Sequence, residues 1–585
     1  YILLQFIMKG NIVSATNLNN ATIDVEVLNL MFKKLRENIE IKHVNWNHFK
    51  CPNASVNIFL QCMNYQFLQN AKVNIAILDH ENITNNVIDY LPNMDHVFCK
   101  SEYSFSVIST ALKQRGYSTD NLVTTGWRSP NIEVGIESKN FNKILLYCEQ
   151  RNSDVYSRLI DVWEPDLPTL EVVGANTNIL LRNVKARKQQ ANINYNDTIE
   201  GQQFHKLFNE CGYHLILEDK ASYEHLINQC QQVGSVPIAL FGGSNKELIS
   251  NDTGFPLSCK KRKSDDEKLG SRFTCSPESV LEKVRHIMTL SDESVRLTAR
   301  DARLFSHNST QKFESKFLEI FKEVVNHVRH TKKINYTLKE EDLPTVSIIT
   351  PTYNRAKFFP LAIYNFNSFN YPREKLEWII VDDSESGKSV EHLLPSKQSR
   401  HKYNIEYIRL DEKHTIGAKR NMAVENSKHD IIVCMDDDDY YYPDSIKNRV
   451  QTLVGLSERY SQIKGVCCAT FAAFEINKYI SMINNKNYNL PFYHKLSPAT
   501  LVVYRDFINL NDETQRFSDT DKYEAENLVK QRVNNMAEIS WEDNMVALIH
   551  SNNISDMRVP GDEKPNGCHF KFSEKLFKFI TGLDK

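Results

Sequence analysis

The sequence of 585 residues lacks a charge excess of either sign, because 71 Lys and Arg residues face 73 Asp and Glu residues and the formal net charge is −2. Proteins that bind nucleic acid or anionic lipid through their overall field carry a large basic excess, so nucleic acid is not an expected partner. The local run Lys260–Lys263 is followed closely by Asp265, Asp266 and Glu267. This balance favours a solvated loop over a nuclear-localisation signal.

Long apolar runs are also absent, and no segment approaches the roughly 18 apolar residues of a membrane-spanning helix. The opening YILLQFIM is too short for a signal peptide and lacks a basic leader. Because residue 1 is Tyr, either Met8 is the natural start or sequence precedes Tyr1. The 12 cysteines follow no repeating framework and several lie in apolar segments, which favours free thiols in a reducing compartment. We expect a cytoplasmic protein without a membrane span.

Repeats, heptads and low-complexity blocks are missing too, while 41% hydrophobic and 25% charged residues are typical of a soluble globular protein. Strand-like apolar runs alternate with helical patterns up to residue 330, and this alternation predicts parallel sheets with covering helices. We predict an α/β chain with Rossmann-like domains at 1–135 and 136–330, the second ending in helices at 277–329. A polar linker at 331–343 leads to a further α/β domain at 344–585.

Four consecutive aspartates, Asp436–Asp439, follow the apolar run at 431–435. Neighbouring carboxylates repel one another, so such a cluster needs compensation. A helix-loop-helix calcium site requires Gly at the sixth loop position and Glu at the twelfth, but Tyr441 and Lys447 stand there. A solvated turn is the other alternative, although loops at strand carboxyl ends form the ligand crevice of open α/β sheets. The run favours Mg²⁺ or Mn²⁺ carrying a diphosphate, because these cations prefer carboxylate and phosphate oxygens.

Three further motifs accompany the aspartates: the loop PTYNR after the strand-like run VSIIT, the acidic pair after EWIIV, and the element GAKRN. In this order they resemble an inverting family 2 glycosyltransferase with the GT-A fold, from about Thr345 to the C-terminus. The resemblance implies a D-x-D metal motif on Asp436 and Asp438, with Asp439 alongside, and Mn²⁺ or Mg²⁺ as the cofactor. It implies nucleotide-binding residues at Pro351, Tyr353, Asn354, Arg355, Asp382, Asp383, Gly417, Lys419, Arg420, Asn421 and Asp436.

Lys419 and Arg420 suit cationic contacts near phosphates, and the alternative for them is the exposed face of a helix. Inverting transfer also needs a base that takes the proton of the acceptor hydroxyl. The resemblance places this base in a downstream E-D pair, with Asp543 preferred and Glu542 as the alternative. The segment after the pair suggests a helix, and acids in a first turn also complement the helix dipole. His569 is a candidate late ligand of the metal or phosphate, or else a surface histidine.

The front half, residues 8–330, more weakly resembles the GT-B fold of family 4 glycosyltransferases, in which two Rossmann-like domains flank a donor cleft. That family carries a spaced pair of glutamates, but Ala221 and Gln229 stand at the corresponding positions. We therefore expect this half to be inactive in donor transfer and to serve as a scaffold, an acceptor-binding module or an oligomerisation surface. Glu218 and Glu224 lie close by, so a divergent active site is the alternative.

The leading hypothesis is a metal-dependent inverting glycosyltransferase whose C-terminal domain uses a nucleotide-diphosphate sugar, UDP-linked by the habit of the family. The acceptor is a hydroxyl of a glycan, a protein or a lipid. The alternatives are a bifunctional enzyme with two active transferase domains and a non-catalytic glycan-binding scaffold. A sugar nucleotidyltransferase would carry a Gly-rich loop after its first strand, but residues 350–359 contain no glycine.

Overall fold

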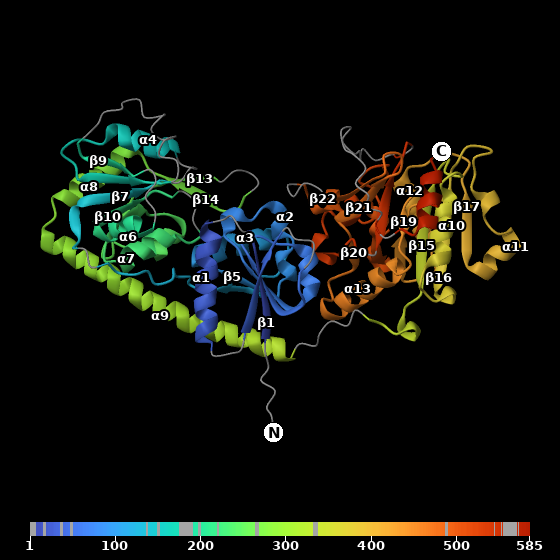
Figure 1. Cartoon of the computed structure of the whole chain (residues 1–585), viewed down its shortest axis with the longest axis horizontal. Helices are drawn as coiled ribbons and strands as arrows, with labels where there is room; N and C mark the ends of the chain where they lie inside the picture. Colours follow the sequence, from blue (N-terminus) through green and yellow to red (C-terminus); the bar gives the residue numbers. More distant parts are fainter. Residues whose placement is uncertain are drawn as a thin grey trace, which may run out of the picture. The chain divides into compact units, whose positions relative to one another are not determined.

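The computed structural model describes residues 8–15, 19–35, 39–46, 51–135, 138–148, 153–174, 191–196, 201–218, 222–263, 268–330, 337–485, 490–542, 544–551, 553, 570 and 572–584. The chain forms two compact units. Unit 1 comprises Tyr1–Asn64 and Asn70–Thr331, and unit 2 comprises Tyr65–Gln69 and Lys332–Lys585. Parallel strands alternate with helices in both units, which confirms the predicted α/β class (Figure 1).

The first sheet of unit 1 has six strands in the order β2-β1-β3-β4-β5-β6, and all pairs are parallel. Its elements are β1 (Met8–Ser14), α1 (Asn19–Lys34), β2 (Ile39–Asn45), β3 (Ala54–Leu60), β4 (Ala71–Ile77), α2 (Asn85–Ile88), β5 (His96–Cys99), α3 (Glu102–Gln114) and β6 (Leu122–Thr124). Buried Asn11, Asn57 and Asn74 stand in register on three neighbouring strands. Their amides are linked by hydrogen bonds of 2.9 and 3.2 Å. A register slip would leave these amides unpaired, so the ladder specifies the alignment.

The second sheet of unit 1 has the order β12-β11-β10-β7-β8-β9, which is the strand order of the doubly wound dinucleotide-binding fold. Its elements are β7 (Asn140–Tyr147), α4 (Ser153–Val162), β8 (Thr169–Val173), β9 (Ile193–Asn196), α6 (Gly201–Glu210), β10 (Cys211–Ile216), α7 (His225–Gln232), β11 (Val236–Leu240) and β12 (Phe255–Leu257). All of its strand pairs are parallel.

The predicted helical region ends unit 1 as α8 (Pro277–Met288) and the 39-residue α9 (Asp292–His330). Helix α9 serves two cores. Val295 and Ala299 lie in the core of the second sheet, whereas Phe313, Phe317 and Phe321 lie in the core of the first. One departure from the sequence prediction concerns the basic run, which forms the exposed strand β13 (Lys260–Lys263) paired with β14 (Ser271–Thr274), rather than a loop.

Unit 2 is built on a seven-stranded sheet in the order β17-β16-β15-β18-β23-β20-β24. Its strands are β15 (Val346–Thr352), β16 (Leu376–Asp382), β17 (Ile405–Arg409), β18 (Ile431–Cys434), β20 (Gly465–Cys467), β23 (Val502–Tyr504) and β24 (Met536–Glu538). Strands β15 to β18 are mutually parallel, and β23 runs antiparallel to β18. Trp378 anchors the core, stacking on Phe359 with ring centroids 5.7 Å apart and donating from Nε1 to Thr350 Oγ1.

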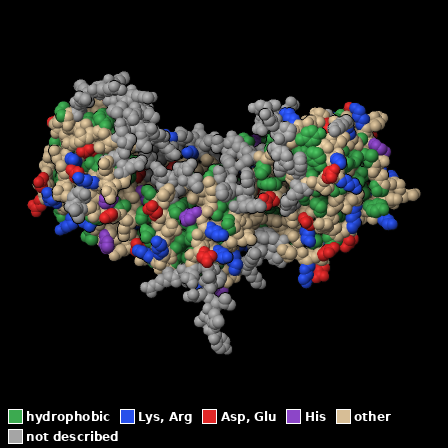
Figure 2. Space-filling model, viewed as in Figure 1, with side chains coloured by type: hydrophobic (Ala, Val, Ile, Leu, Met, Phe, Trp, Pro, Cys, Tyr) green, Lys and Arg blue, Asp and Glu red, His purple; other side chains and the backbone are tan. Residues whose placement is uncertain are grey.

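A four-stranded sheet completes unit 2 in the order β19-β25-β21-β22. It consists of β19 (Tyr440–Tyr441), β21 (Thr470–Glu475), β22 (Ile480–Asn485) and β25 (Met545–Ile549). The helices of unit 2 are α10 (Phe359–Ser368), α11 (Lys397–Arg400), α12 (Ile416–Glu425), α13 (Ser445–Arg459), α14 (Phe492–Lys495), α15 (Glu526–Val529) and α16 (Glu574–Gly582). On the molecular face drawn in Figure 2, basic and acidic side chains are interspersed, in keeping with the near-neutral composition.

Candidate active site

The sequence motifs of unit 2 meet at one edge of its large sheet. Strand β15 ends at Thr352, β16 at Asp382 and β18 at Cys434, and the three strands are parallel neighbours. Their carboxyl ends therefore lie side by side, where open α/β sheets bind ligands. The PTYNR loop, the acidic pair and the aspartate run leave the sheet at these ends. We call this the aspartate edge.

The first and third aspartates of the run are paired with arginines. Asp436 Oδ1 lies 2.7 Å from Arg420 Nη2, and Asp438 Oδ2 lies 3.1 Å from Arg355 Nη2. The side chain of Asp436 is 30% exposed and that of Asp438 is 14% exposed. Burial raises the pKa of Asp438, but a contact with His550 and the charge of Arg355 outweigh burial, so the pKa is lowered. Both carboxylates are thus paired with an arginine at the edge.

The second and fourth aspartates point into the protein. Asp437 accepts a hydrogen bond from Thr352 Oγ1, and Asp439 accepts one from the backbone N–H of Leu548 in β25. Burial and the charge of Asp438 raise the pKa of Asp437 to about 7 and that of Asp439 well above its usual range. The repulsion within the run is therefore relieved by protonation inside and by arginines outside. Asp439, which the resemblance places beside the metal, has one oxygen engaged by the backbone.

The GAKRN element begins α12, and its cations are buried rather than exposed. Lys419 Nζ donates to Asp383 Oδ1 (2.7 Å) and to the carbonyl of Thr352 (2.9 Å). Arg420 is 1% exposed and also approaches Glu524 Oε1 at 3.4 Å. Both cations are thus engaged by carboxylates of the protein, and their first role in this structure is to orient the acids of the edge.

Gly417 and Asn421 hold the segment 517–524 against α12. Asn421 donates to the carbonyl of Phe517 and accepts from its N–H, at 2.9 and 3.0 Å. A Cβ on Gly417 would lie 1.7 Å from the carbonyl oxygen of Ser518, so no larger residue fits at this approach. The GAKRN element therefore fixes the aspartates on one side and a neighbouring loop on the other.

The two aspartates of the acidic pair, Asp382 and Asp383, have different hydrogen-bond partners. Asp382 is fully buried and accepts hydrogen bonds from the N–H groups of Ser384 and Val390 and from Tyr407 Oη. Burial raises its pKa, but these hydrogen bonds outweigh burial and the pKa is lowered. Asp383 accepts from the N–H of His414 at 2.7 Å in addition to Lys419. Asp382 thus shapes the loop, and Asp383 joins it to α12.

The PTYNR loop is shaped by an unusual backbone angle. Asn354 has a φ of 55°, and its N–H donates to Ser384 Oγ while its Oδ1 accepts from the N–H of Glu385. Asparagine tolerates the left-handed region better than most residues. The half-buried ring of Tyr353 lies beside Lys413, whose Nζ is 4.4 Å from the ring centroid. Pro351 itself lies within β15 and is buried.

His550 is a member of the edge that the sequence reasoning missed. It directly follows β25, its side chain is fully buried, and Nε2 lies 3.1 Å from Asp438 Oδ2. Its ring stacks on Phe358 with centroids 4.0 Å apart. The signal was present as a histidine at the end of the apolar run MVALI, the position at which strands deliver functional groups. His569, the histidine selected from the sequence, lies outside the described residues.

The predicted helix after the E-D pair is wrong. Glu542 lies in the turn between β24 and β25, and residues from Met545 form a strand that pairs with β19 and β21. The apolar run is buried on both faces of this strand, which removes the alternation that would have identified it. Glu542 N–H donates to Ser540 Oγ. Asp543 lies outside the described residues.

The described donors suit a cation that arrives with its ligand. Within the part of the chain that the structure describes, no three His, Cys, Asp or Glu side chains are grouped to hold a metal ion. Mg²⁺ commonly takes only one or two protein carboxylates, with phosphate oxygens and water completing its shell. Asp436 and Asp438 fit that requirement. Buried Arg355 Nη1 and Arg420 Nη1, which have no hydrogen-bond partner among the described atoms, fit a neighbouring anion.

The corresponding edge of the first sheet in unit 1 is filled by the protein itself. Lys100 lies 2.6 Å from Asp24 Oδ2 and 2.8 Å from Asp79 Oδ1, and Gln61 donates to Asp24. His225, from the second sheet's side, approaches Asp24 at 3.4 Å. All five side chains are buried or nearly so. We call them the front network.

A second group closes the same crevice. Ser222 Oγ lies 2.6 Å from Glu81 Oε2 and 2.8 Å from His80 Nδ1. Burial and the charge of Asp79 raise the pKa of Glu81 to about 7. Gly270 (φ 86°) covers His80 so closely that a Cβ would lie 2.5 Å from the imidazole. Glu224 caps α7 by accepting from the N–H of Leu226.

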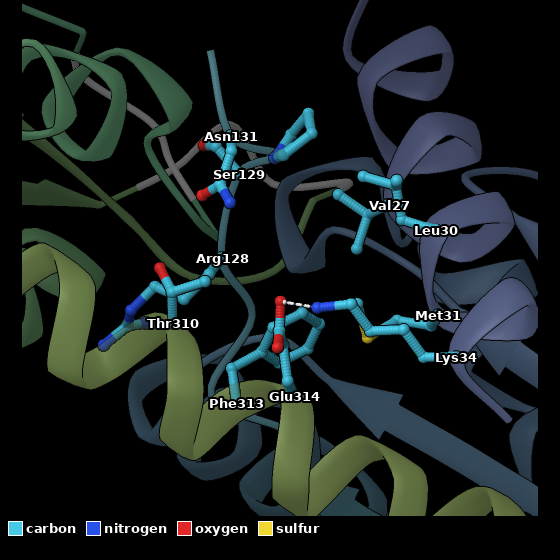
Figure 3. Close-up of a pocket in the computed structure, with 11 residues that line it drawn as sticks. Val27, Leu30, Met31, Lys34, Arg128, Ser129, Asn131, Thr310, Phe313 and Glu314 are labelled. Atoms are coloured by element: carbon cyan, nitrogen blue, oxygen red, sulfur yellow. Dashed lines mark ion pairs between the residues drawn. The ribbon is translucent and has the colours of Figure 1, made fainter. Parts of the chain in front are cut away.

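Unit 1 also has a cavity of about 180 Å³ between α1, residues 128–131 and α9 (Figure 3). Val27, Met31 and Phe313 form apolar walls, and an ion pair between Lys34 and Glu314 lies at its border. None of the residues that the sequence analysis selected lines it. Among the described helices, none has the length and apolar character to cross a membrane.

Residues 347–479 match the sequence model of the family described as Glycosyl transferase family 2. This segment contains β15, β16, β18 and the aspartate run, with the geometry given above. Residues 347–479 form a glycosyltransferase family 2 domain. The resemblance inferred from the four motifs is thereby confirmed for residues 347–479, which contain all four.

Two curated relatives each match a segment of this chain, and each segment is about as long as the family 2 domain. The dolichyl N-acetyl-alpha-D-glucosaminyl phosphate 3-beta-D-2,3-diacetamido-2,3-dideoxy-beta-D-glucuronosyltransferase of Methanococcus voltae is 26% identical over 123 residues, 21% of this chain and 37% of that protein. The poly(ribitol-phosphate) beta-N-acetylglucosaminyltransferase TarS of Staphylococcus aureus is 24% identical over 103 residues, 17% of this chain and 18% of that protein. The chain thus spans well under half the length of either relative.

The crystal structure of S. aureus TarS 1-349 is similar to 35% of this chain and 60% of that one, with 17% identity and a TM-score of 0.27. At this score the likeness supports no inference.

Proposed function

We propose that the chain transfers a sugar, with inversion, from a nucleotide-diphosphate sugar to a hydroxyl acceptor, and that unit 2 performs the reaction. The observation that supports this most is the meeting of the four motifs of the family 2 domain at one sheet edge. The two curated relatives bear the names of glycosyl-transferring enzymes, which agrees with this class of reaction. The donor is UDP-linked by the habit of the family.

In this proposal the acidic side chains of the aspartate edge bind the metal ion, and the basic side chains bind the diphosphate. Asp436 and Asp438 are the residues that would hold Mn²⁺ or Mg²⁺, and a bound cation would stabilise the departing diphosphate as a Lewis acid. Arg355, 3.1 Å from Asp438, would bind a phosphate oxygen through the Nη1 group that lacks a hydrogen-bond partner among the described atoms. The ring of Tyr353 and the carboxylate of Asp383 would contact the nucleoside. His550 is a further candidate ligand beside Asp438, and His569 stays the candidate proposed from the sequence.

A donor screen tests this function. The full chain is incubated with Mn²⁺ and a panel of UDP, GDP, CMP and dTDP sugars, and the release of nucleotide is measured with and without excess chelator. We expect one donor class to be hydrolysed slowly without acceptor, and chelator to stop the reaction. Release of no nucleotide from any donor would contradict the function, and full activity in chelator would contradict the metal.

The proposed base is Asp543, with Glu542 as the alternative. A base within about 3 Å of the acceptor hydroxyl contributes roughly 10²–10⁴-fold to the rate. Asp543→Asn preserves size but cannot take the proton, so we expect turnover to fall by that factor while nucleotide affinity changes little. Glu542→Gln is the matched variant. If only Glu542→Gln loses turnover, Glu542 is the base, and if neither does, the pair has no role in proton transfer.

A further inference from the structure

Three rings from two segments of unit 2 lie in contact and form a partly exposed aromatic cluster, which we call the aromatic platform. It consists of Tyr493 and His494 in α14 and Tyr523 in the loop before α15. The ring centroids of Tyr493 and His494 are 4.7 Å apart, and those of His494 and Tyr523 are 4.6 Å apart. Tyr523 is 52% exposed, so one ring of the platform presents much of its surface to solvent.

The backbone holds Tyr523 in a strained conformation. Its φ is 56°, in the left-handed region that bulky L-residues rarely adopt. Neighbouring hydrogen bonds enforce this turn: Ser518 N–H donates to the carbonyl of Glu524 (2.6 Å), and Glu526 N–H donates to the carbonyl of Tyr523 (2.8 Å). A large ring held outward at this cost gains little from packing, since half of it is exposed. Such strain is commonly found where a residue has a binding role.

Both segments of the platform lie at the aspartate edge. Strand β23 is antiparallel to β18, so the chain that enters β23 lies at the carboxyl end of β18. This is seen in the hydrogen bonds from Cys434 N–H to the carbonyl of Leu501 and from Tyr441 Oη to the carbonyl of Ala499. Helix α14 immediately precedes this stretch. The platform therefore stands on the side of the sheet where the motifs converge.

The loop that carries Tyr523 is fastened to the GAKRN helix. Gly417 N–H donates to the carbonyl of Thr520, and Ile416 N–H donates to Asp521 Oδ1 at 2.9 Å. Glu524, the next residue after Tyr523, lies 3.4 Å from Arg420 Nη2, which in turn lies 2.7 Å from Asp436. Two side-chain contacts thus connect the platform loop with an aspartate proposed to bind the metal.

Charged groups border the rings. His494 Nε2 lies 3.1 Å from Glu526 Oε2, and Lys530 Nζ lies 2.9 Å from Glu526 Oε1. The same ammonium is 5.5 Å from the centroid of Tyr493. An apolar ring face beside a carboxylate and an ammonium matches a sugar ring, whose C–H face is apolar and whose hydroxyls both donate and accept hydrogen bonds.

We propose that the aromatic platform binds a sugar ring of the acceptor, which makes the acceptor a glycan or a glycoconjugate. This rests on the proposed transferase function, because the aspartate edge provides the donor. Stacking against Tyr523 would place the rest of the acceptor near Asp436, on the exposed side of the edge.

The platform is tested by carbohydrate binding, independently of donor turnover. Saturation-transfer difference NMR is recorded on the full chain with cellotriose, maltotriose, mannotriose and chitotriose as probes. We expect at least one trisaccharide to bind wild-type protein, and Tyr523→Ala to weaken its binding about tenfold, the loss of one stacked ring. Tyr523→Phe keeps the ring and should bind as wild type.

Tyr403→Ala is the matched control. Tyr403 is 42% exposed in the same unit, but it precedes β17 and so lies at the opposite edge of the sheet. Its loss should leave binding unchanged. Failure of all four trisaccharides to bind, or unchanged binding by Tyr523→Ala, would overturn the proposal that the platform binds a sugar ring. The first of these results would favour an acceptor without a sugar.

Nucleotide release without acceptor separates the two proposals. Tyr523→Ala should release nucleotide at the wild-type rate while its transfer to an acceptor falls through a higher KM. Nucleotide release together with absent sugar binding would retain the transferase and remove the platform. Sugar binding without any nucleotide release would leave the platform as a glycan-binding surface and refute the transferase.

Discussion

The two units present polar groups at the same place in their sheets, yet the groups are in different states. In unit 1, the strand ends carry the front network, in which Lys100 is 1% exposed and bound to two buried carboxylates. In unit 2, Asp436 keeps 30% of its side chain exposed, and Arg355 and Arg420 each retain a buried Nη1 group without a hydrogen-bond partner among the described atoms. Asp24 Oδ1, Asp79 Oδ1 and His225 Nε2 of the first edge also lack a hydrogen bond among the described atoms, but each takes part in an ion pair within the front network. The contrast is therefore between charges that the protein pairs with one another and two arginine Nη1 groups that are left for a ligand.

This difference separates a structural cluster from a binding site better than position does. The carboxyl ends of parallel strands form the crevice in both sheets, and both crevices contain buried charges. Ligand binding requires hydrogen-bonding capacity that the protein leaves unused, because buried polar groups otherwise find partners. We therefore propose that unit 2 carries the reaction and that the paired charges at the edge of unit 1 are structural. The expectation that unit 1 is inactive in donor transfer remains our proposal.

The largest effect should come from Asp438→Asn. Removing this carboxylate should lower transferase turnover about 10³–10⁴-fold, because metal stabilisation of a leaving group contributes several kcal/mol. Donor turnover and nucleotide affinity are measured together with the unfolding temperature, which should stay near that of the wild type. Asp506→Asn is the control, since Asp506 is an exposed aspartate paired with Lys464 at the opposite edge. Wild-type turnover by Asp438→Asn would show that the aspartate edge is not the site.

Lys100→Met should have the next largest effect, and on stability instead of turnover. Loss of a buried ion-pair partner leaves Asp24 and Asp79 uncompensated, which typically costs about 3–5 kcal/mol. Denaturant unfolding followed by intrinsic tryptophan fluorescence measures it, and Trp127, whose ring lies 5.7 Å from Lys100 Nζ, contributes to that signal. Lys113→Met, an exposed change on α3, should alter stability by less than about 0.5 kcal/mol. Lost turnover with preserved stability would instead make the front network a functional site.

The smallest effect should be the pH dependence contributed by Glu81. Its pKa of about 7 in the folded protein exceeds the usual value near 4.3 in an unfolded chain. The folded state therefore binds more protons between about pH 4 and 7, and the free energy of unfolding falls as pH rises through this window. Glu81→Gln resembles the protonated form. It should be about 1–3 kcal/mol more stable than wild type at pH 8 and nearly equal at pH 4.5.

Glu282→Gln, on the exposed face of α8, is the control for this titration and should follow the wild-type curve. Equal pH profiles for Glu81→Gln and wild type would show that burial and the charge of Asp79 do not hold the Glu81 carboxyl protonated.

The sequence predicted the parts of the site that depend on neighbours along the chain. Apolar runs followed by PTYNR, by Asp382 and Asp383, and by the aspartate run place side chains at strand ends, since a strand delivers its next residues to the sheet edge. The strand-helix alternation likewise predicted the α/β class.

The remaining features depend on partners distant in sequence. The burial of Arg420 is set by Glu524, 104 residues away, and that of Lys419 by Asp383. The run MVALI was misread because a strand buried on both faces shows no period of two. His550 was overlooked because the strand before it was not recognised. Its proposed role also depends on its contact with Asp438, which is distant in sequence. Local pattern identifies the ends of elements, but it cannot tell which long-range partner meets them.

Helix α9 has a mechanical consequence for unit 1. Its first turns pack in the core of the second sheet and its later turns pack in the core of the first. The helix is therefore a rigid brace shared by the two cores. A movement of one core away from the other would require α9 to bend. Its 39 residues contain neither proline nor glycine, which are the usual sites of helix kinks. We therefore expect the two cores that α9 joins to unfold in one transition.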